Sequence, residues 1–256
     1  MTSPRNPVVV IPARLAATRF PDKPLADLCG EPMIVHVWRR AVEADVGPVL
    51  VACGDAAIAD AIRAAGGDAV MTDPALPSGS DRVHQAVERS DPGGDHDAVI
   101  NVQGDLPTIE PAVIAAALAP LAEPEVDIAT LAAVITEARE RSDPNVVKAV
   151  LAVADGATAG RALYFSRASV PSGDGPLYHH IGLYAFRRTA LARFVALPQG
   201  VLERRERLEQ LRALEAGMRI DAALVDTVPL GVDTPADLAR ARSILLSQPP
   251  NAETST

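Results

Sequence analysis

The feature of this chain that most constrains its fold is a run of β-branched residues, Val8 to Ile11, that ends at Pro12. An apolar run bounded by turn residues is typical of a strand that is covered on both faces of a sheet. Helical periodicity follows at 33–42, a second strand at 48–53, and a second helix after its capping residue Asp55. This alternation predicts an α/β fold with a doubly wound, mostly parallel sheet.

The rest of the chain continues this alternation, with one irregular region. Further strands are expected at 68–71, 97–102, 127–134, 146–153, 161–167, 180–187 and 218–225. Further helices are expected at 111–121, over Leu208 to Leu214, and after the capping residues Ser80, Thr189 and Thr234. We therefore expect one domain over 1–246 with a mixed strand region inserted near 127–187, followed by a polar, disordered tail over 247–256.

Composition narrows the class of protein. The net charge of −9 argues against a general affinity for nucleic acid, which needs a basic surface. Cys29 and Cys53 lack the spacing of a zinc site or a disulfide framework. Residues 1–7 do not resemble a signal peptide, and no apolar run is long enough to span a membrane. A cytoplasmic protein with neither nucleic-acid nor membrane partners is expected.

A basic loop follows the first strand. It carries Arg14, Arg19 and Lys23 against a single acid, Asp22. Open α/β sheets bind their ligands beyond the carboxyl ends of the strands, so these cations suit a polyanion such as a triphosphate. Surface Arg and Lys are common, so a solvated loop remains an equal alternative for this segment on its own.

Two acids suggest a metal site. Asp105 follows the strand at 97–102 and suits a divalent metal that also contacts phosphate, although it also suits the cap of a turn. Thr234 and Asp237 match a capping box, which leaves the carboxylate of Asp233 for another role. Two acids and three cations can hold Mg²⁺ and a triphosphate. Such a set suits attack on the α-phosphorus with pyrophosphate as the leaving group.

Other patterns are absent or ambiguous. The sequence contains no dinucleotide fingerprint, no P-loop and no G-x-S-x-G nucleophile motif. The small residues at 78–80 suit contacts to a ribose, base or phosphate, or a simple helix cap. Glu209 and Gln210 leave the leucine stripe and face a cavity or water. Asn145 and Lys148 either face solvent or approach a ligand.

Several motifs, taken together, resemble those of one enzyme family. They are IPAR at 11–14, T-R-x-P-x-K-P at 18–24, PMIVHV at 32–37, SGSDR at 78–82, NVQGD at 101–105, ALYFSR at 162–167, HIGLY at 180–184, LEQLR at 208–212 and GVDTP at 231–235. In this order, over nearly the whole chain, they resemble the 3-deoxy-manno-octulosonate (KDO) cytidylyltransferases. The resemblance implies a nucleotide-diphospho-sugar transferase-like fold and the formation of CMP-KDO and pyrophosphate from CTP and KDO. It also implies a Mg²⁺ cofactor and a cytoplasmic homodimer that serves lipopolysaccharide synthesis.

The resemblance also implies roles for matching residues. The catalytic set is Arg14 and Lys23, which would neutralise the CTP phosphates, with Asp105 and Asp233, which would hold Mg²⁺. The remaining nucleotide-binding residues are Ala13, Ser78, Arg82 and Gln103. The sugar-binding residues are Arg167, His180, Tyr184, Glu209 and Gln210, with Arg167 suited to pair with the sugar carboxylate.

The chain departs from the family pattern at three places. Leu106 stands where the family usually has Glu, Ala17 replaces a small hydroxyl residue, and the segment at 168–179 is short. The close alternative is cytidylyl transfer to another acidic sugar, such as a sialic acid or an amino-substituted KDO. A non-catalytic nucleotide-binding subunit is the alternative from another class. Retention of all four catalytic residues favours an enzyme.

Overall fold

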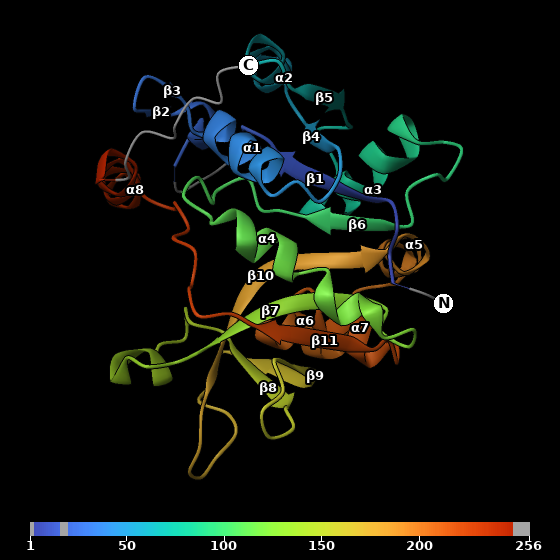
Figure 1. Cartoon of the computed structure of the whole chain (residues 1–256), viewed down its shortest axis with the longest axis vertical. Helices are drawn as coiled ribbons and strands as arrows, with labels where there is room; N and C mark the ends of the chain where they lie inside the picture. Colours follow the sequence, from blue (N-terminus) through green and yellow to red (C-terminus); the bar gives the residue numbers. More distant parts are fainter. Residues whose placement is uncertain (1–2, 16–19, 248–256) are drawn as a thin grey trace.

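The computed structural model describes residues 3–15 and 20–247. Within them, one mixed sheet has the strand order β5-β4-β1-β6-β10-β7-β11-β9-β8 (Figure 1). The strands are β1 (Pro7–Ala13), β4 (Val49–Cys53), β5 (Asp68–Met71), β6 (Ala98–Asn101), β7 (Ile128–Val134), β8 (Lys148–Ala152), β9 (Ala159–Ser166), β10 (Tyr178–Arg187) and β11 (Ile220–Leu224). A small hairpin pairs β2 (Asp27–Leu28) with β3 (Glu31–Pro32).

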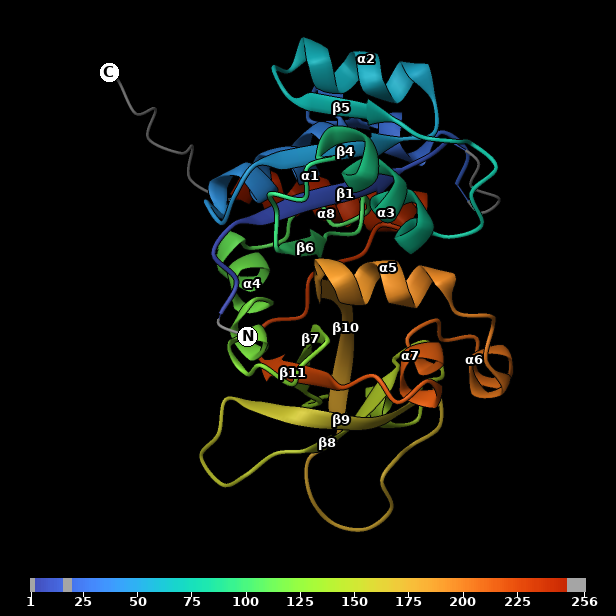
Figure 2. The same ribbon diagram turned by 90° about the vertical axis from the view of Figure 1, so that its right-hand side faces the viewer.

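Helices cover both faces of the sheet (Figures 1 and 2). They are α1 (Met33–Glu43), α2 (Ala56–Ala64), α3 (Gly79–Ser90), α4 (Pro111–Ala116), α5 (Arg188–Ala196), α6 (Val201–Glu206), α7 (Leu211–Glu215) and α8 (Pro235–Ser247). Short 3₁₀ turns are η1 (Lys23–Leu25), η2 (Ala119–Ala122) and η3 (Ala138–Arg141).

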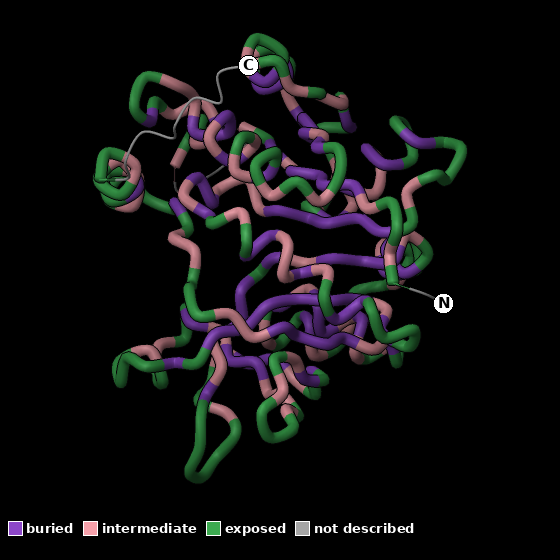
Figure 3. Tube along the Cα trace, viewed as in Figure 1, coloured by how far each residue is buried: buried purple, intermediate pink, exposed green. Residues whose placement is uncertain are grey.

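The first strand shows how the core is built. Successive side chains of a strand point to opposite faces, so β1 contributes to two apolar layers. Val9 and Ile11 pack in the layer formed with α1, α2 and α4, while Val8 and Val10 pack in the layer formed with α3, α5 and α7. Figure 3 shows the strands as a buried centre with exposed loops around it. The doubly wound α/β class expected from the sequence is confirmed.

Strand direction divides the sheet into two regions. β5, β4, β1 and β6 run parallel to one another, and so does the pair β7 and β11. β10 is antiparallel to β6 and to β7, and β9 is antiparallel to β8 and to β11. The mixed region predicted near 127–187 is present, and β11 extends it beyond the predicted range.

Four helices differ from the sequence expectation. Ser78, not Ser80, caps α3, and the residue that precedes α5 is Arg187 rather than Thr189. The helix expected at 111–121 is divided into α4 and η2. The leucine stripe at 208–214 is not one helix, because α7 starts only at Leu211 and Leu208 lies in the segment after α6, whose C-cap Arg207 has a left-handed φ of 57°. The expected tail lies outside the described residues, apart from Ser247, which ends α8.

Candidate active site

The carboxyl ends of β1 and β6 bring the first group of predicted site residues together. The two strands are parallel neighbours, so the loops that follow them start at the same edge of the sheet. A cavity of about 340 Å³ opens there. Its lining includes five of the predicted catalytic and nucleotide-binding residues, namely Ala13, Arg14, Lys23, Gln103 and Asp105.

Lys23 joins the two predicted metal-binding acids. Its Nζ donates to Asp105 Oδ2 at 2.9 Å and to Asp233 Oδ1 at 3.2 Å. Burial opposes the charge of Lys23, but the charges and hydrogen bonds of Asp105 and then Asp233 outweigh it and raise the pKa of the ammonium group. The two carboxylates, which are far apart in sequence, therefore converge on one positive charge.

Local capping explains why Asp233 is available for this pair. The Asp237 backbone N–H donates to Thr234 Oγ1 at 3.2 Å, and the Thr234 backbone N–H donates to Asp237 Oδ2 at 3.0 Å. This is the capping box predicted from the sequence, and it starts α8. The Val232 backbone N–H donates to the Asp105 carbonyl at 2.9 Å, which fixes the segment before α8 beside the loop that follows β6.

The converging acids fit a divalent cation that also binds phosphate. In the part of the chain that the structure describes, no group of three or more His, Cys, Asp or Glu side chains forms a complete metal cage. Mg²⁺ is usually held by one or two carboxylates, and water and substrate phosphates complete its coordination. Asp105 and Asp233 supply that number of carboxylates.

A second cationic side chain, Arg82 of α3, lies beside the end of β4. Arg82 is only 2% exposed, and its Nη1 donates to Thr72 Oγ1 and to the Asp73 carbonyl. Its Nη2 is buried without a hydrogen-bond partner among the described residues. Burial, and then the charge of Arg14, lowers the pKa of Arg82. A Cβ on Gly54 would lie 2.9 Å from Arg82 Nη1, so glycine permits this close approach.

Asp55 has a role that the sequence did not indicate. It precedes α2 as predicted, but its side chain makes no capping hydrogen bond. Instead, Asp55 Oδ2 accepts from the Leu15 backbone N–H at 2.8 Å. The carboxylate therefore holds the start of the basic loop against the end of β4. Arg19 and Ala17 of that loop lie outside the described residues.

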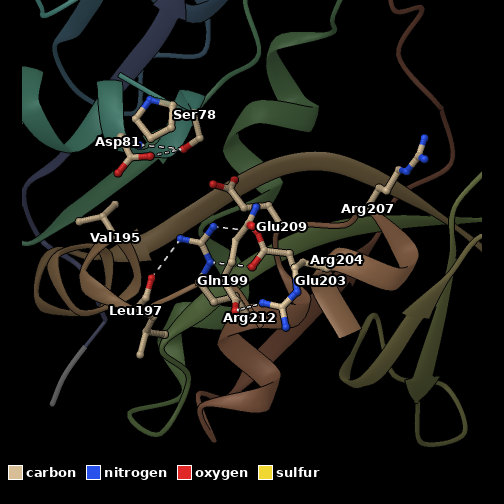
Figure 4. Close-up of a pocket in the computed structure, with 11 residues that line it drawn as sticks. Ser78, Asp81, Val195, Leu197, Gln199, Glu203, Arg204, Arg207, Glu209 and Arg212 are labelled. Carbon is tan, nitrogen blue, oxygen red and sulfur yellow. Dashed lines mark hydrogen bonds and ion pairs between the residues drawn. The ribbon is translucent and has the colours of Figure 1, made fainter. Parts of the chain in front are cut away.

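A larger cavity, of about 760 Å³, separates the start of α3 from the α5–α7 segment (Figure 4). Ser78 and Asp81 line one side, where the Asp81 backbone N–H donates to Ser78 Oγ at 3.2 Å. Glu209 and Arg212 line the opposite side. The cavity thus lies between a predicted nucleotide-binding residue, Ser78, and a predicted sugar-binding residue, Glu209.

His180 is the centre of a buried polar group. It is 8% exposed, its Nε2 lies 3.1 Å from Thr130 Oγ1, and its Nδ1 lies 3.4 Å from Gln210 Nε2. The Thr130 hydroxyl donates to the Leu183 carbonyl at 2.9 Å, so it accepts from a protonated Nε2, and Nδ1 accepts from the amide of Gln210. Burial, and then the neighbouring His179, lowers the pKa of His180 to about 3. The ring is therefore neutral.

Tyr184 lies in a row of aromatic rings on the same face of β10. The ring centroids of His180 and Tyr184 are 5.6 Å apart, and those of Tyr184 and Phe186 are 5.9 Å apart. Burial, and then the charge of Glu209, raises the pKa of Tyr184. Tyr184 therefore keeps its phenolic proton and can donate a hydrogen bond.

The structure places Arg167 in a different setting. Its Nε donates to the Glu206 carbonyl at 2.9 Å, and its Nη1 donates to the Pro144 carbonyl at 3.0 Å. These bonds tie the end of α6 to the loop before β8. Four of the five predicted sugar-binding residues are thus grouped beside β10 and the break after α6, and the guanidinium of Arg167 is held by backbone carbonyls at the end of α6 and before β8.

Two buried polar residues were missed or left open by the sequence reasoning. Thr130 is fully buried. It is the only polar residue in the apolar run at 128–133, a pattern that could have indicated a buried hydrogen bond. Lys148 does not face solvent, which excludes one of the two alternatives left open by the sequence. It is fully buried and donates to the carbonyls of Asp143 and Val146 at 2.6 and 2.7 Å. Leu106 is buried in the apolar core, so this position adds no charge beside the acids.

Fold and site together define a nucleotidyltransferase. An α/β sheet presents cations and two converging acids at the carboxyl ends of its strands, around a cavity that suits a nucleoside triphosphate. Within residues 3–15 and 20–247, no helix is both long and apolar enough to cross a membrane.

Comparisons with known proteins make the assignment specific. A family model for cytidylyltransferases matches residues 8–220. The 3-deoxy-manno-octulosonate cytidylyltransferase of Rhodospirillum centenum is 71% identical over 95% of this chain and 95% of its own length. That of Paramagnetospirillum magneticum is 68% identical over 94% of this chain and 98% of its own length. This chain belongs to the 3-deoxy-manno-octulosonate cytidylyltransferase family.

Solved structures agree with this assignment. The structure of CMP:2-keto-3-deoxy-manno-octonic acid synthetase complexed with CTP matches with a TM-score of 0.86 and 38% identity, covering 94% of this chain and 99% of that one. A nucleotidyl transferase from Methanothermobacter thermautotroptrophicus matches with a TM-score of 0.61 and 16% identity over 94% of this chain and 98% of that one, and shares the fold.

Proposed function

We propose that this protein transfers CMP from CTP to KDO and releases pyrophosphate. The observation that carries this proposal is the convergence of Asp105 and Asp233 on Lys23, beside Arg14, in a cavity at the strand ends. A triphosphate needs cations for its oxygens, and a metal that bridges them needs carboxylates. Family membership supplies the substrate class.

In the proposed reaction, the anomeric hydroxyl oxygen of KDO forms a bond to the α-phosphorus of CTP. The bond between the α-phosphorus and the bridging oxygen breaks, pyrophosphate leaves with that oxygen, and the hydroxyl proton passes to solvent. Arg14 and Lys23 stabilise the charge on the phosphate oxygens, and Lys23 exchanges its carboxylate partners for them. Mg²⁺ held by Asp105 and Asp233 would neutralise further charge on the triphosphate.

The nucleotide and sugar sites are proposed on either side of the larger cavity. Ala13, Ser78, Arg82 and Gln103 contact the cytidine nucleotide, with the unpartnered Nη2 of Arg82 available to an acceptor. Tyr184, Glu209, Gln210 and His180 form the sugar side, where neutral donors and one carboxylate suit a polyhydroxylated ring. Arg167 reaches the sugar carboxylate only if it releases its backbone carbonyl partners.

A pyrophosphate-release assay with CTP, Mg²⁺ and a panel of sugar acids tests the proposal. We expect release with KDO and little with a sialic acid or an amino-substituted KDO. Release with another acid but not with KDO would overturn the substrate, and no release with any acid would favour a non-catalytic nucleotide-binding subunit. Removing Mg²⁺ with a chelator should abolish pyrophosphate release.

Cellular context and assembly complete the proposal. The enzyme acts in the cytoplasm, as a homodimer, in the synthesis of lipopolysaccharide. Light scattering coupled to size-exclusion chromatography tests the assembly, and a mass twice that of one chain is expected. A mass equal to that of one chain would contradict the dimer and leave the proposed reaction untouched.

A further inference from the structure

The first turn of α3 contacts the opposite side of the larger cavity through Ser80. This serine is 4% exposed, and its Oγ donates to Glu209 Oε2 at 2.9 Å. Ser80 belongs to the helix whose cap, Ser78, is a proposed nucleotide-binding residue. Glu209 belongs to the break between α6 and α7, on the proposed sugar side. One hydrogen bond thus connects the two sides of the cavity.

Helix capping does not explain this serine, because Ser78 already caps α3. Ser and Thr near a helix start usually serve as the cap. Here Ser78 is the cap, because its side chain accepts from the Asp81 backbone N–H. The Ser80 hydroxyl donates its hydrogen bond to Glu209, so it connects α3 to another element rather than capping its own helix.

The second oxygen of Glu209 indicates what this contact achieves. Oε1 is buried and has no hydrogen-bond partner within residues 3–15 and 20–247. A buried carboxylate oxygen without a donor costs free energy, so such an atom requires a donor from a ligand or from water. Glu209 lines the larger cavity and also the small one beside Tyr184. In Figure 4 its side chain lies between Arg212 and the segment that carries Ser78 and Asp81.

We infer that Ser80 is a positioning residue for the sugar substrate and acts through Glu209. By holding Oε2, it fixes the carboxylate in the cavity wall and leaves Oε1 to accept a hydrogen bond from a sugar hydroxyl. The inference rests on the proposed function, because it assumes that the acceptor of CMP is a polyhydroxylated sugar acid. It adds to the sugar site a residue that lies on a helix of the nucleotide side.

Steady-state kinetics with KDO and CTP varied separately test this inference. Ser80→Ala should raise KM for KDO about five- to tenfold, the scale of the net contribution of one typical hydrogen bond. KM for CTP should change less than about twofold, because Ser78 and its cap are intact. Ser80→Thr keeps the hydroxyl and should restore most of the KM for KDO.

Ser90→Ala is the matched control. Ser90 lies at the other end of α3, and its hydroxyl donates to the Ala86 carbonyl at 2.8 Å. The control carries the same substitution in the same helix and should leave both KM values unchanged. An equal rise in KM for KDO in Ser90→Ala would assign the effect to the stability of α3.

A double-mutant cycle with Glu209→Ala tests whether Ser80 acts through Glu209. If Ser80 acts through Glu209, adding Ser80→Ala to Glu209→Ala should leave kcat/KM for KDO unchanged, although Ser80→Ala alone lowers it. Additive effects would overturn the inference, as would an unchanged KM for KDO in Ser80→Ala. Failure of the wild-type protein to release pyrophosphate with KDO would instead overturn the proposed function, so the two failures are distinguishable.

Discussion

The charged group at the strand ends and the buried group around His180 are built by opposite means. The group at the strand ends of β1 and β6 consists of full charges that water reaches, with side-chain exposures of 15% for Lys23, 32% for Asp105 and 57% for Asp233. The group around His180 is neutral and buried, and it is held by Thr130 and Gln210. In the first group, charged side chains form ion pairs. In the second group, neutral side chains form hydrogen bonds.

This difference suggests different behaviour on binding. Partly exposed ion pairs contribute little net free energy, so Lys23 can exchange its partners at low cost. Buried hydrogen bonds are costly to break, because each freed polar atom loses its partner without gaining water. We therefore expect the phosphate side to rearrange around the triphosphate, and the sugar side to be formed before the sugar arrives.

The largest expected effect is on the charged group. Asp105→Asn and Asp233→Asn should each lower kcat on the order of 10²-fold or more, the scale of losing one preorganised electrostatic contact in an active site. The midpoint of thermal unfolding should change little, because both acids are partly exposed. Pyrophosphate release and thermal unfolding measure the two quantities. Asp174→Asn, on an exposed loop, is the control, and kcat values for the site variants close to that of the control would contradict the assigned role.

The buried group should respond in stability rather than in rate. Thr130→Val keeps the side-chain shape but removes the hydroxyl that donates to the Leu183 carbonyl and accepts from His180 Nε2. The free energy of unfolding should fall by about 1–3 kcal/mol, the cost of unsatisfied buried polar groups. Urea unfolding measures this change. Thr158→Val, at an exposed position, should change it by less than about 0.5 kcal/mol. Equal effects of the two substitutions would refute the contrast.

Salt should have a smaller effect than these substitutions, and it should change KM for the two substrates differently. Raising ionic strength from about 0.05 M to about 0.5 M shortens the screening length several-fold and weakens attraction between exposed charges. KM for CTP should therefore rise several-fold, and KM for KDO should rise less. Initial rates over a series of NaCl concentrations measure both constants. A greater rise for KDO would mean that the sugar side also binds mainly by charge.

The smallest expected effect is the absence of a titration. The pKa of His180 is lowered to about 3 from 6.5, so the folded protein keeps this ring neutral from pH 5 to 8. The Cε1–H signal of His180 in NMR spectra, assigned with a His180→Gln variant, should not move over that range. A midpoint near the ordinary value of about 6.5 would contradict the buried, neutral ring.

The same shift predicts how stability depends on pH. Between about 3 and 6.5 the unfolded chain binds a proton at His180 that the folded chain does not bind. This residue's contribution to stability is therefore lost as the pH falls from 6.5 toward 3. His180→Gln should reduce the slope of unfolding free energy against pH in that window, as measured by urea unfolding at a series of pH values. An unchanged slope would refute the linkage.

Local chemistry was predictable wherever neighbours in sequence decide the outcome. The capping box of Thr234 and Asp237 formed as expected, because both partners lie within one turn. Local reasoning failed where two residues competed for one role. Ser78 and Ser80 both suit a helix start, and the side chain of Ser80 lies instead on Glu209, a residue distant in sequence. The late start of α7 was missed because the leucine spacing is already helical from Leu208 onward.

By itself, the sequence determined the α/β class, the strand ends that carry the charges and, through its motifs, the enzyme family. Periodicity and capping are properties of short segments, so they can be read without coordinates. Only the tertiary structure decided the partners of the site residues. Lys23 bridges two acids, Thr130 supports His180, and the Arg167 guanidinium contacts backbone carbonyls. These contacts join segments far apart in the chain, and packing alone brings those segments together.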